Sequence, residues 1–268
     1  MLQSLIQSAQ RAGAAIMAVY ATDFAVREKP DESPVTIADE AAEKILLADL
    51  AQIAPGVPVV AEEAVAAGIV PVVADRFFLV DPLDGTREFV SHRDEFTVNI
   101  ALIEAGEPVL GVVFAPARRE LYWGDVKAGR AGTIDADPDG TMPSLGSSIA
   151  ARVVPARGLI AVASRSHRTP ETDAFLTNYS IAEFRSIGSS LKFCLVAAGQ
   201  ADIYPRIGTT MEWDTAAGHA VLVAAGGRVT GLDGEPFRYG KPGFRNGNFV
   251  AWGRSSVPGE SELVPGGA

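Results

Sequence analysis

The stretch Phe77-Phe78-Leu79-Val80-Asp81-Pro82-Leu83-Asp84-Gly85-Thr86 joins an apolar run to a turn that carries two carboxylates. The run 77–80 predicts a buried β-strand that ends at Asp81. The pair Pro82-Leu83 predicts a sharp turn, which brings the carboxylates of Asp81 and Asp84 toward one small volume. Gly85 allows close backbone approach, and Thr86 is predicted to begin a helical turn whose free N–H groups suit an anion. The alternative is that both Asp residues serve only as turn and cap residues.

Two further acidic motifs lie far from this stretch in the chain. The pair Glu62-Glu63 follows a predicted strand at 57–60, and Trp213-Asp214-Thr215-Ala216-Ala217-Gly218 begins a predicted helix. Each also has an ordinary interpretation, because acidic pairs are commonly solvated and Asp214 can be a helix N-cap. If these residues converge on the Asp81 turn, carboxylates about 4 Å apart repel by roughly 4 kcal/mol at an effective dielectric constant of 20. Such a cluster requires cations, and an oxygen-only ligand set suits Mg²⁺ better than zinc.

The composition is that of a globular protein. The chain has 268 residues, 47% of them hydrophobic, and a formal net charge of −10, which argues against binding to a nucleic-acid polymer. No signal-peptide pattern or transmembrane run is present, so we expect a soluble cytoplasmic protein, with peripheral association with the inner membrane left open. The single cysteine, Cys194, excludes an internal disulfide and is expected to pack in the core.

Periodicity predicts a mixed α/β protein with stacked helix and sheet layers. Residues 1–131 form an N-terminal α+β half that carries most of the acidic motifs, 132–148 a boundary loop, 149–253 a C-terminal α/β half, and 254–268 a disordered tail. A charged loop is expected at 23–33. Helices are predicted at 2–20, 36–50, 171–178, 189–199 and 215–225. Strands are predicted at 57–60, 77–80, 96–104, 109–115, 120–123, 159–163, 181–186, 201–205, 228–230 and 248–252.

Taken together, the three acidic motifs resemble the lithium-sensitive, magnesium-dependent phosphatase superfamily that includes the inositol monophosphatases. The resemblance extends over nearly the whole chain, to about Trp252. It implies a layered αβαβα sugar-phosphatase fold and hydrolysis of a phosphate ester with two or three Mg²⁺ ions. The implied metal ligands are the side chains of Glu62, Asp81, Asp84 and Asp214 and the backbone carbonyl of Leu83.

The same resemblance assigns roles to neighbouring residues. Asp39, Glu63 and Thr86 are implied to polarise or orient the attacking water, and the N–H groups of Gly85 and Thr86 to hold the phosphate oxygens. Asp39 has an alternative role, since Thr36-x-x-Asp39 has the spacing of a helix capping box. The connection 64–74 is shorter and more apolar than in many members of the superfamily, which leaves the number of ions open.

Within the superfamily the chain is most similar to the CysQ group of bacterial 3'(2'),5'-bisphosphate nucleotidases. The motifs are Ser164-Arg165-Ser166-His167, Gly188-Ser189-Ser190-Leu191-Lys192-Phe193-Cys194 and Tyr204-Pro205-Arg206. The matching residues, implied to contact the nucleotide and its second phosphate, are His167, Ser189, Lys192 and Arg206. A phosphate away from the metals needs such cationic donors. The alternatives are a surface Lys192, a strand-capping Arg206 and a loop His167.

The implied activity is hydrolysis of the 3'-phosphate of adenosine 3',5'-bisphosphate to AMP and phosphate, and of its sulfated form PAPS, in sulfur assimilation. The partner is therefore a small nucleotide bisphosphate, and a homodimer is left open. Three alternatives remain: an inositol monophosphatase or related small phosphate-ester hydrolase, a noncatalytic metal- or nucleotide-responsive binding protein, and a structural or interaction domain whose motifs are accidental.

Overall fold

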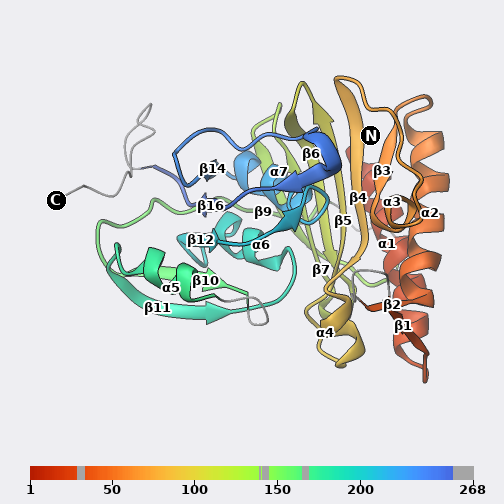
Figure 1. Cartoon of the computed structure of the whole chain (residues 1–268), viewed down its shortest axis with the longest axis horizontal. Coiled ribbons are helices and arrows are strands. Elements are labelled where there is room, and N and C mark those ends of the chain that lie inside the picture. The colour runs from red at the N-terminus through yellow and green to blue at the C-terminus, as the bar shows by residue number, and fades with distance from the viewer. Residues whose placement is uncertain (29–33, 139, 141–144, 165–168, 256–268) are drawn as a thin grey trace.

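The computed structural model describes residues 1–28, 34–138, 140, 145–164 and 169–255. Five layers follow one another across the molecule (Figure 1). Helices α1 (Leu2–Tyr20) and α2 (Ile37–Ile53) cover a seven-stranded sheet, and α6 (Leu191–Ala197) and α7 (Ala216–Ala224) separate it from a five-stranded sheet. Helix α5 (Pro170–Leu176) lies outside the second sheet. The predicted αβαβα fold is confirmed.

The outer helix layer forms where the sequence predicts it. Helix α1 buries one stripe that includes Leu5, Ile6 and Ile16, because apolar residues recur at three- and four-residue steps. Helix α2 begins at a capping box. The backbone N–H and the hydroxyl of Thr36 both donate to Asp39 Oδ2 at 2.8 Å, which fixes that carboxylate at the first turn.

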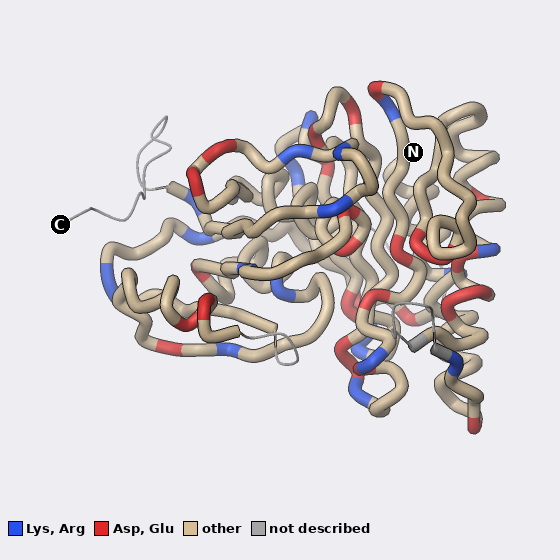
Figure 2. Tube along the Cα trace, in the orientation of Figure 1, with Lys and Arg blue, Asp and Glu red and all other residues tan. Residues whose placement is uncertain are grey.

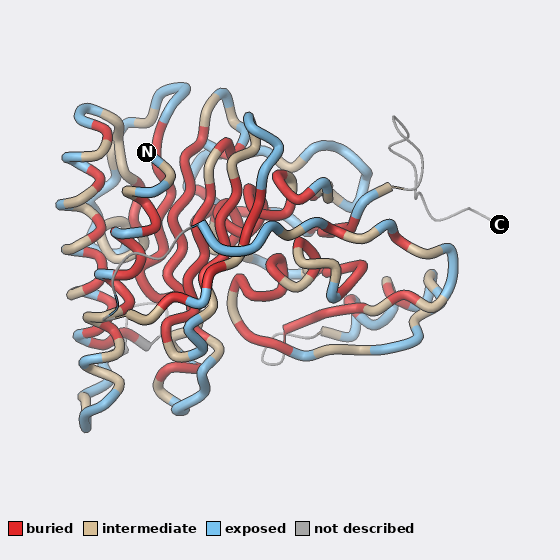
Figure 3. The backbone as a smooth tube through the Cα atoms, turned by 180° about the vertical axis from the view of Figure 1, so that it is seen from behind, coloured by how far each residue is buried: buried red, intermediate tan, exposed pale blue. Residues whose placement is uncertain are grey.

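The seven-stranded sheet provides the frame of the molecule. Its order is β3 (Val59–Ala61), β4 (Arg76–Asp84), β5 (Thr97–Glu104), β6 (Glu107–Ala115), β7 (Glu120–Asp125), β8 (Arg130–Asp135) and β9 (Ser147–Ser148). Only the pair β3 and β4 is parallel. Phe77 and Leu79 on β4 pack in the core shared with α6 and α7, whereas Phe78 and Val80 pack against α1 and α2. Both faces of the sheet are therefore covered, as Figure 3 shows by its buried strands.

Two segments that the sequence predicts as loops contain strands. In the predicted boundary loop 132–148, β8 occupies the start and β9 the end. Gly132 pairs with Trp123 of β7, and a Cβ at position 132 would lie 2.5 Å from the Trp123 ring, so the glycine makes room for the indole. In the predicted charged loop 23–33, β1 (Val26–Glu28) pairs with β2 (Pro34–Thr36).

The five-stranded sheet has the order β11 (Ile181–Ser186), β10 (Leu159–Ala163), β12 (Ile203–Arg206), β16 (Phe249–Trp252) and β14 (Arg228–Gly231). Helix α7 covers β5, β6 and β7 of the other sheet at close range, since a Cβ on Gly111 would lie 2.4 Å from the Ala217 carbonyl oxygen. The two predicted halves therefore share one core.

Short elements surround the ends of the strands. These are helices α3 (Glu62–Ala66) and α4 (Thr86–Val90), the 3₁₀ turns Pro116–Arg118 and Pro242–Phe244, and the paired strands β13 (Thr210–Met211) and β15 (Arg245–Asn246). Acidic segments gather around α3 and α4 (Figure 2). Among the described helices, none is long and apolar enough to cross a bilayer.

Candidate active site and metal centre

A β-bulge brings Asp81 and Asp84 to one face of the sheet. The predicted sharp turn after Asp81 is instead a continuation of β4, in which Asp81 pairs with Asn99 and Asp84 pairs with Thr97. Three residue steps on β4 thus oppose two steps on β5. Without the extra residue, positions three apart would point to opposite faces, so the bulge turns both carboxylates to the same side. Pro82 is tolerated because a bulge interrupts the hydrogen-bond ladder.

The carboxylate of Asp84 is held by three donors from both halves of the chain. Asp84 Oδ2 accepts hydrogen bonds from the hydroxyls of Ser189 at 2.8 Å and Ser190 at 3.2 Å, and from Asn99 Nδ2 at 3.5 Å. Ser190 Oγ also lies 2.8 Å from the backbone oxygen of Asp214. This one hydroxyl therefore joins the Asp84 and Asp214 segments, which are far apart in the sequence.

The four predicted metal-binding carboxylates act electrostatically on one another. Burial raises the pKa of Asp81, and the charges of Glu62, Asp84 and Asp214 raise it further. Burial likewise raises the pKa of Asp214, together with the charges of Asp84 and Glu62. Convergence of Glu62 and Asp214 on the Asp81 turn, which the motifs predict, is what such mutual effects require.

The donor set fits a hard divalent cation. Carboxylate oxygens and the Leu83 carbonyl are the ligand types that Mg²⁺ prefers. Within the described ranges, no three His, Cys, Asp or Glu side chains lie as close together as the ligands of a single ion do. Repulsion of roughly 4 kcal/mol per pair at 4 Å favours this wider spacing of the carboxylates. The metal assignments of Glu62, Asp81, Leu83, Asp84 and Asp214 stay predictions.

Thr86 contacts Asp39, and the charge of Glu63 acts on the Asp39 carboxylate. Thr86 Oγ1 is 3.2 Å from both Asp39 Oδ1 and the Leu83 carbonyl oxygen, so its single proton serves two acceptors. Burial raises the pKa of Asp39 to about 6, against the hydrogen bonds from Thr36 and with a contribution from the charge of Glu63. Asp39 is therefore both the capping-box residue of α2 and the partner of Thr86.

Two cationic side chains share the site with the carboxylates. Lys192 is buried, with its ammonium donating to the carbonyls of Ser189 and Ile187, so the surface alternative for Lys192 is wrong. Burial lowers the pKa of Lys192 to about 8; the charge of Asp84 opposes this shift and that of Arg206 adds to it. Arg206 donates from Nη2 to the Thr209 carbonyl at 3.3 Å.

One cavity of about 280 Å³ contains both the acidic and the cationic residues. Its wall includes Glu62, Asp84, Gly85, Thr86, Ser189, Lys192, Arg206 and Asp214. The cavity therefore offers carboxylates for cations together with an ammonium and a guanidinium group for an anion. This arrangement suits a ligand with two separated phosphates.

Several sequence expectations have definite outcomes. The N-cap alternative for Asp214 is wrong, because the helix cap is Thr215 and Asp214 Oδ2 accepts from the Met211 N–H at 2.7 Å. Cys194 is buried as predicted. His167 lies outside the described residues.

The sequence analysis missed the groups that hold the site residues in place. Asn99, Thr97 and Glu43 act through contacts between distant elements; Glu43 Oε2, for example, accepts from the Glu63 N–H at 2.8 Å. Nothing in their local sequence distinguishes them. Ser190 had a signal, since it belongs to the Gly188-Ser189-Ser190 motif.

Comparison with known proteins identifies the class. The model of the inositol monophosphatase family matches residues 1–257, and the chain therefore belongs to this family. The chain is 45% identical over 253 residues to "3'(2'),5'-bisphosphate nucleotidase CysQ" of Salmonella typhimurium, and 44% identical over 253 residues to the protein of that name from Escherichia coli. Each alignment covers 91% of this chain and 98% of the relative. The resemblance to both the family and its CysQ group is confirmed.

Solved structures agree with this assignment. The crystal structure of CysQ from Bacteroides thetaiotaomicron, described as a bacterial member of the inositol monophosphatase family, has a TM-score of 0.78 at 38% identity, over 94% of this chain and 97% of that one. An inositol monophosphatase from Anabaena has a TM-score of 0.72 at 26% identity, over 95% and 90% of the two chains.

Proposed function

We propose that this protein is a Mg²⁺-dependent phosphatase that hydrolyses the 3'-phosphate of adenosine 3',5'-bisphosphate, yielding AMP and phosphate, with PAPS as a second substrate. The observation that carries the proposal is the shared cavity, whose wall contains Glu62, Asp84 and Asp214 together with Lys192 and Arg206. The similarity to relatives named as nucleotidases supports the choice of a bisphosphate over a simple phosphate ester.

The residues divide the work by charge. Glu62, Asp81, Asp84, Asp214 and the Leu83 carbonyl would hold two or three Mg²⁺ ions. Mg²⁺ held there would supply Lewis acidity toward the phosphate oxygens and offset the charge of the carboxylates. Lys192 and Arg206 would hold the phosphate that is not hydrolysed, with Ser189 and His167 as further substrate contacts. The N–H groups of Gly85 and Thr86 would bind the nonbridging oxygens of the reacting phosphate.

Proton transfer would use Thr86 and Asp39. The Thr86 hydroxyl donates toward Asp39, which leaves its oxygen lone pairs free to accept a proton from the attacking water. Asp39 can receive the displaced proton near neutral pH because burial raises its pKa to about 6. Glu63 would help to orient the water, since its charge acts on the same carboxylate.

Steady-state assays with Mg²⁺ test this substrate choice. We expect kcat/KM for adenosine 3',5'-bisphosphate to exceed that for myo-inositol monophosphate by at least tenfold. A value for the inositol phosphate equal to or above that for the bisphosphate would overturn the nucleotidase assignment in favour of an inositol monophosphatase. Phosphate release unaffected by Asp84→Asn would show that the proposed catalytic role of the Asp84 site is wrong.

A further inference from the structure

A buried carboxylate lies two residues before Asp214 and faces away from the cavity. Glu212 has no exposed surface, and its side chain accepts two backbone hydrogen bonds and forms one ion pair. Glu212 Oε2 accepts from the Gly240 N–H at 2.8 Å, while Oε1 accepts from the Lys241 N–H at 2.9 Å and lies 2.7 Å from Lys241 Nζ. Burying a carboxylate is costly, and these donors offset the cost only while all of them stay in place.

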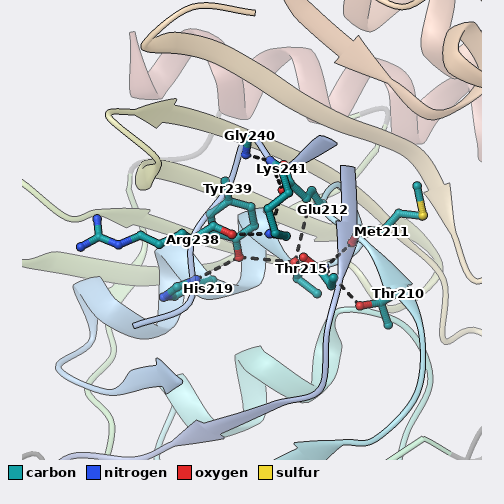
Figure 4. A network of polar contacts seen from close by, with 10 residues as sticks. Thr210, Met211, Glu212, Thr215, His219, Arg238, Tyr239, Gly240 and Lys241 are labelled. Carbon is teal, nitrogen blue, oxygen red and sulfur yellow. Dashed lines mark hydrogen bonds and ion pairs between the residues drawn. The ribbon is translucent and has the colours of Figure 1, made fainter. Parts of the chain in front are cut away.

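The donors come from one segment, residues 237–246, which we call the strap. Figure 4 shows Glu212 and Thr215 pointing toward the strap residues Tyr239, Gly240 and Lys241. The strap continues into β15, which pairs with β13, and the Phe244 carbonyl accepts from the Glu212 N–H at 2.8 Å. The strap is therefore fastened to the Glu212 segment at Gly240 and Lys241 and again at Phe244 and β15.

A second set of hydrogen bonds fastens the strap to the start of α7. The Tyr239 hydroxyl donates to Thr215 Oγ1 at 3.3 Å and lies 2.9 Å from His219 Nδ1. Thr215 Oγ1 in turn donates to the Glu212 carbonyl at 3.2 Å. Asn246 Nδ2 lies 3.0 Å from Thr215 Oγ1 and 2.7 Å from the Met211 carbonyl. The network surrounds the turn 211–215, and Thr215 within it also lines the cavity.

This turn determines where the Asp214 carboxylate points. The N–H groups of Thr215 and Ala216 donate to the Glu212 carbonyl at 3.2 and 3.0 Å, so Glu212 and Asp214 belong to one tight turn. The Asp214 side chain lines the cavity, whereas the Glu212 side chain contacts the strap. Asp214 Oδ2 accepts from Met211 N–H within the same turn. A shift of Glu212 therefore moves the backbone that carries Asp214.

We propose that Glu212 is a positioning residue, which anchors the turn 211–215 to the strap so that the Asp214 carboxylate faces the other carboxylates ready for a cation. This inference rests on the proposed role of Asp214 as a metal ligand. Groups that orient a metal ligand commonly change metal affinity or activity 10–100-fold when replaced. Glu212 contacts neither the cavity nor the substrate, so its effect should fall on cation binding and not on substrate binding.

The test compares Glu212→Gln with a matched control. Asp202→Asn also alters a carboxylate with no exposed surface, which is ion-paired to Arg152 and accepts from the Ile160 N–H at 2.6 Å, but Asp202 does not line the cavity. Calorimetric titration of the full chain with Mg²⁺ alone measures binding directly. Initial rates at varied Mg²⁺ give the Mg²⁺ concentration for half-maximal activity. Rates at saturating Mg²⁺ and varied bisphosphate give the KM for the bisphosphate.

We expect Glu212→Gln to weaken Mg²⁺ binding and raise half-saturating Mg²⁺ about tenfold, with KM at saturating Mg²⁺ changed less than twofold. Asp202→Asn should lower the melting temperature similarly and leave Mg²⁺ binding unchanged. If Glu212→Gln leaves Mg²⁺ binding unchanged, or if both variants weaken it equally, the positioning role is wrong.

A milder variant covers the case in which Glu212→Gln does not fold. Lys241→Met removes the ammonium and keeps both backbone donors, and the Lys241 side chain is 33% exposed. It should weaken Mg²⁺ binding about threefold, and no change would count against the inference. Failure of the proposed function gives a different result from failure of the positioning role. If the proposed function is wrong, the wild-type protein binds no Mg²⁺ and Asp214→Asn has no effect on turnover.

Discussion

Replacing Asp84 with Asn should stabilise the metal-free protein while it abolishes turnover. Asp84 raises the pKa values of both Asp81 and Asp214 through its charge, so the three carboxylates repel one another in the folded state. Asn keeps the shape of Asp and removes the charge. The stabilisation comes from relief of this repulsion, and the loss of activity comes from removal of a proposed metal ligand.

The size of the effect follows from simple terms. Each of the two like-charge pairs is taken to repel by roughly 2 kcal/mol, about half the value for a pair in contact at an effective dielectric constant of 20. Asp84 is partly exposed, which halves the total to about 2 kcal/mol. Weaker hydrogen bonds from Ser189 and Ser190 cost about 1 kcal/mol. The net gain of about 1 kcal/mol raises the melting temperature by about 2 to 4 °C.

The gain should depend on pH with a definite sign. Because the pKa of Asp81 is raised on folding, the folded protein holds protons that the unfolded chain releases. Stability of the metal-free protein therefore falls as pH rises from about 4 through the raised pKa. Asp84→Asn removes one cause of the raised pKa, so its advantage should be largest above this window and vanish below pH about 4.

Thermal denaturation in EDTA at pH 8 and pH 4, repeated at pH 8 with Mg²⁺, measures these effects. Mg²⁺ should raise the melting temperature of the wild type and have little effect on Asp84→Asn. The reasoning is refuted if Asp84→Asn has a lower melting temperature than the wild type in EDTA at pH 8, and if Mg²⁺ raises the melting temperatures of both proteins equally.

Three further predictions concern other parts of the site and core. Since burial lowers the pKa of Lys192 to about 8, KM for the bisphosphate should rise about tenfold per pH unit above pH 8. The rise should be absent in Lys192→Arg. An equal rise in the wild type and in Lys192→Arg would exclude Lys192 as the titrating group. Gly85 has φ +91°, and an added Cβ would lie 3.2 Å from the Glu95 carbonyl oxygen. Gly85→Ala should therefore lower the unfolding free energy, measured by urea denaturation, by about 1 to 3 kcal/mol. It should also lower kcat, measured by phosphate release, at least tenfold. Burial, with the charge of Lys241, lowers the pKa of His219 to about 3. The unfolded chain therefore takes up a proton near pH 6.5 that the folded protein accepts only near pH 3. As pH falls through that window, the stabilisation from neutral His219 should be lost by up to about 1.4 kcal/mol per pH unit. In urea denaturation, the unfolding free energy of His219→Asn should fall less steeply with pH than that of the wild type, and identical slopes would contradict the assignment.

Local sequence patterns predicted the helices and most strands because their causes are local. The capping box at Thr36 and Asp39 and the apolar stripe of α1 each follow from residues within a few positions. The sequence analysis did not predict strand β8, because Gly132 is typical of loops. The glycine is needed there because the Trp123 ring of the neighbouring strand occupies the space of a Cβ.

The site was partly predictable for the same reason. The motif 81–86 identified the two central carboxylates, yet their common direction depends on a bulge set by pairing with β5, which no local pattern contains. The buried position of Lys192 and the anchoring of Glu212 likewise depend on contacts with distant segments. Family resemblance supplied roles for residues, whereas the supporting contacts needed three-dimensional structure.

A crystal structure with Mn²⁺ in place of Mg²⁺ and AMP in the cavity would test the central claim most directly. We predict anomalous density for at least two ions among Glu62, Asp81, Asp84 and Asp214, with the AMP phosphate beside Lys192 and Arg206. Ions bound elsewhere, or an AMP phosphate away from both cationic residues, would contradict the account.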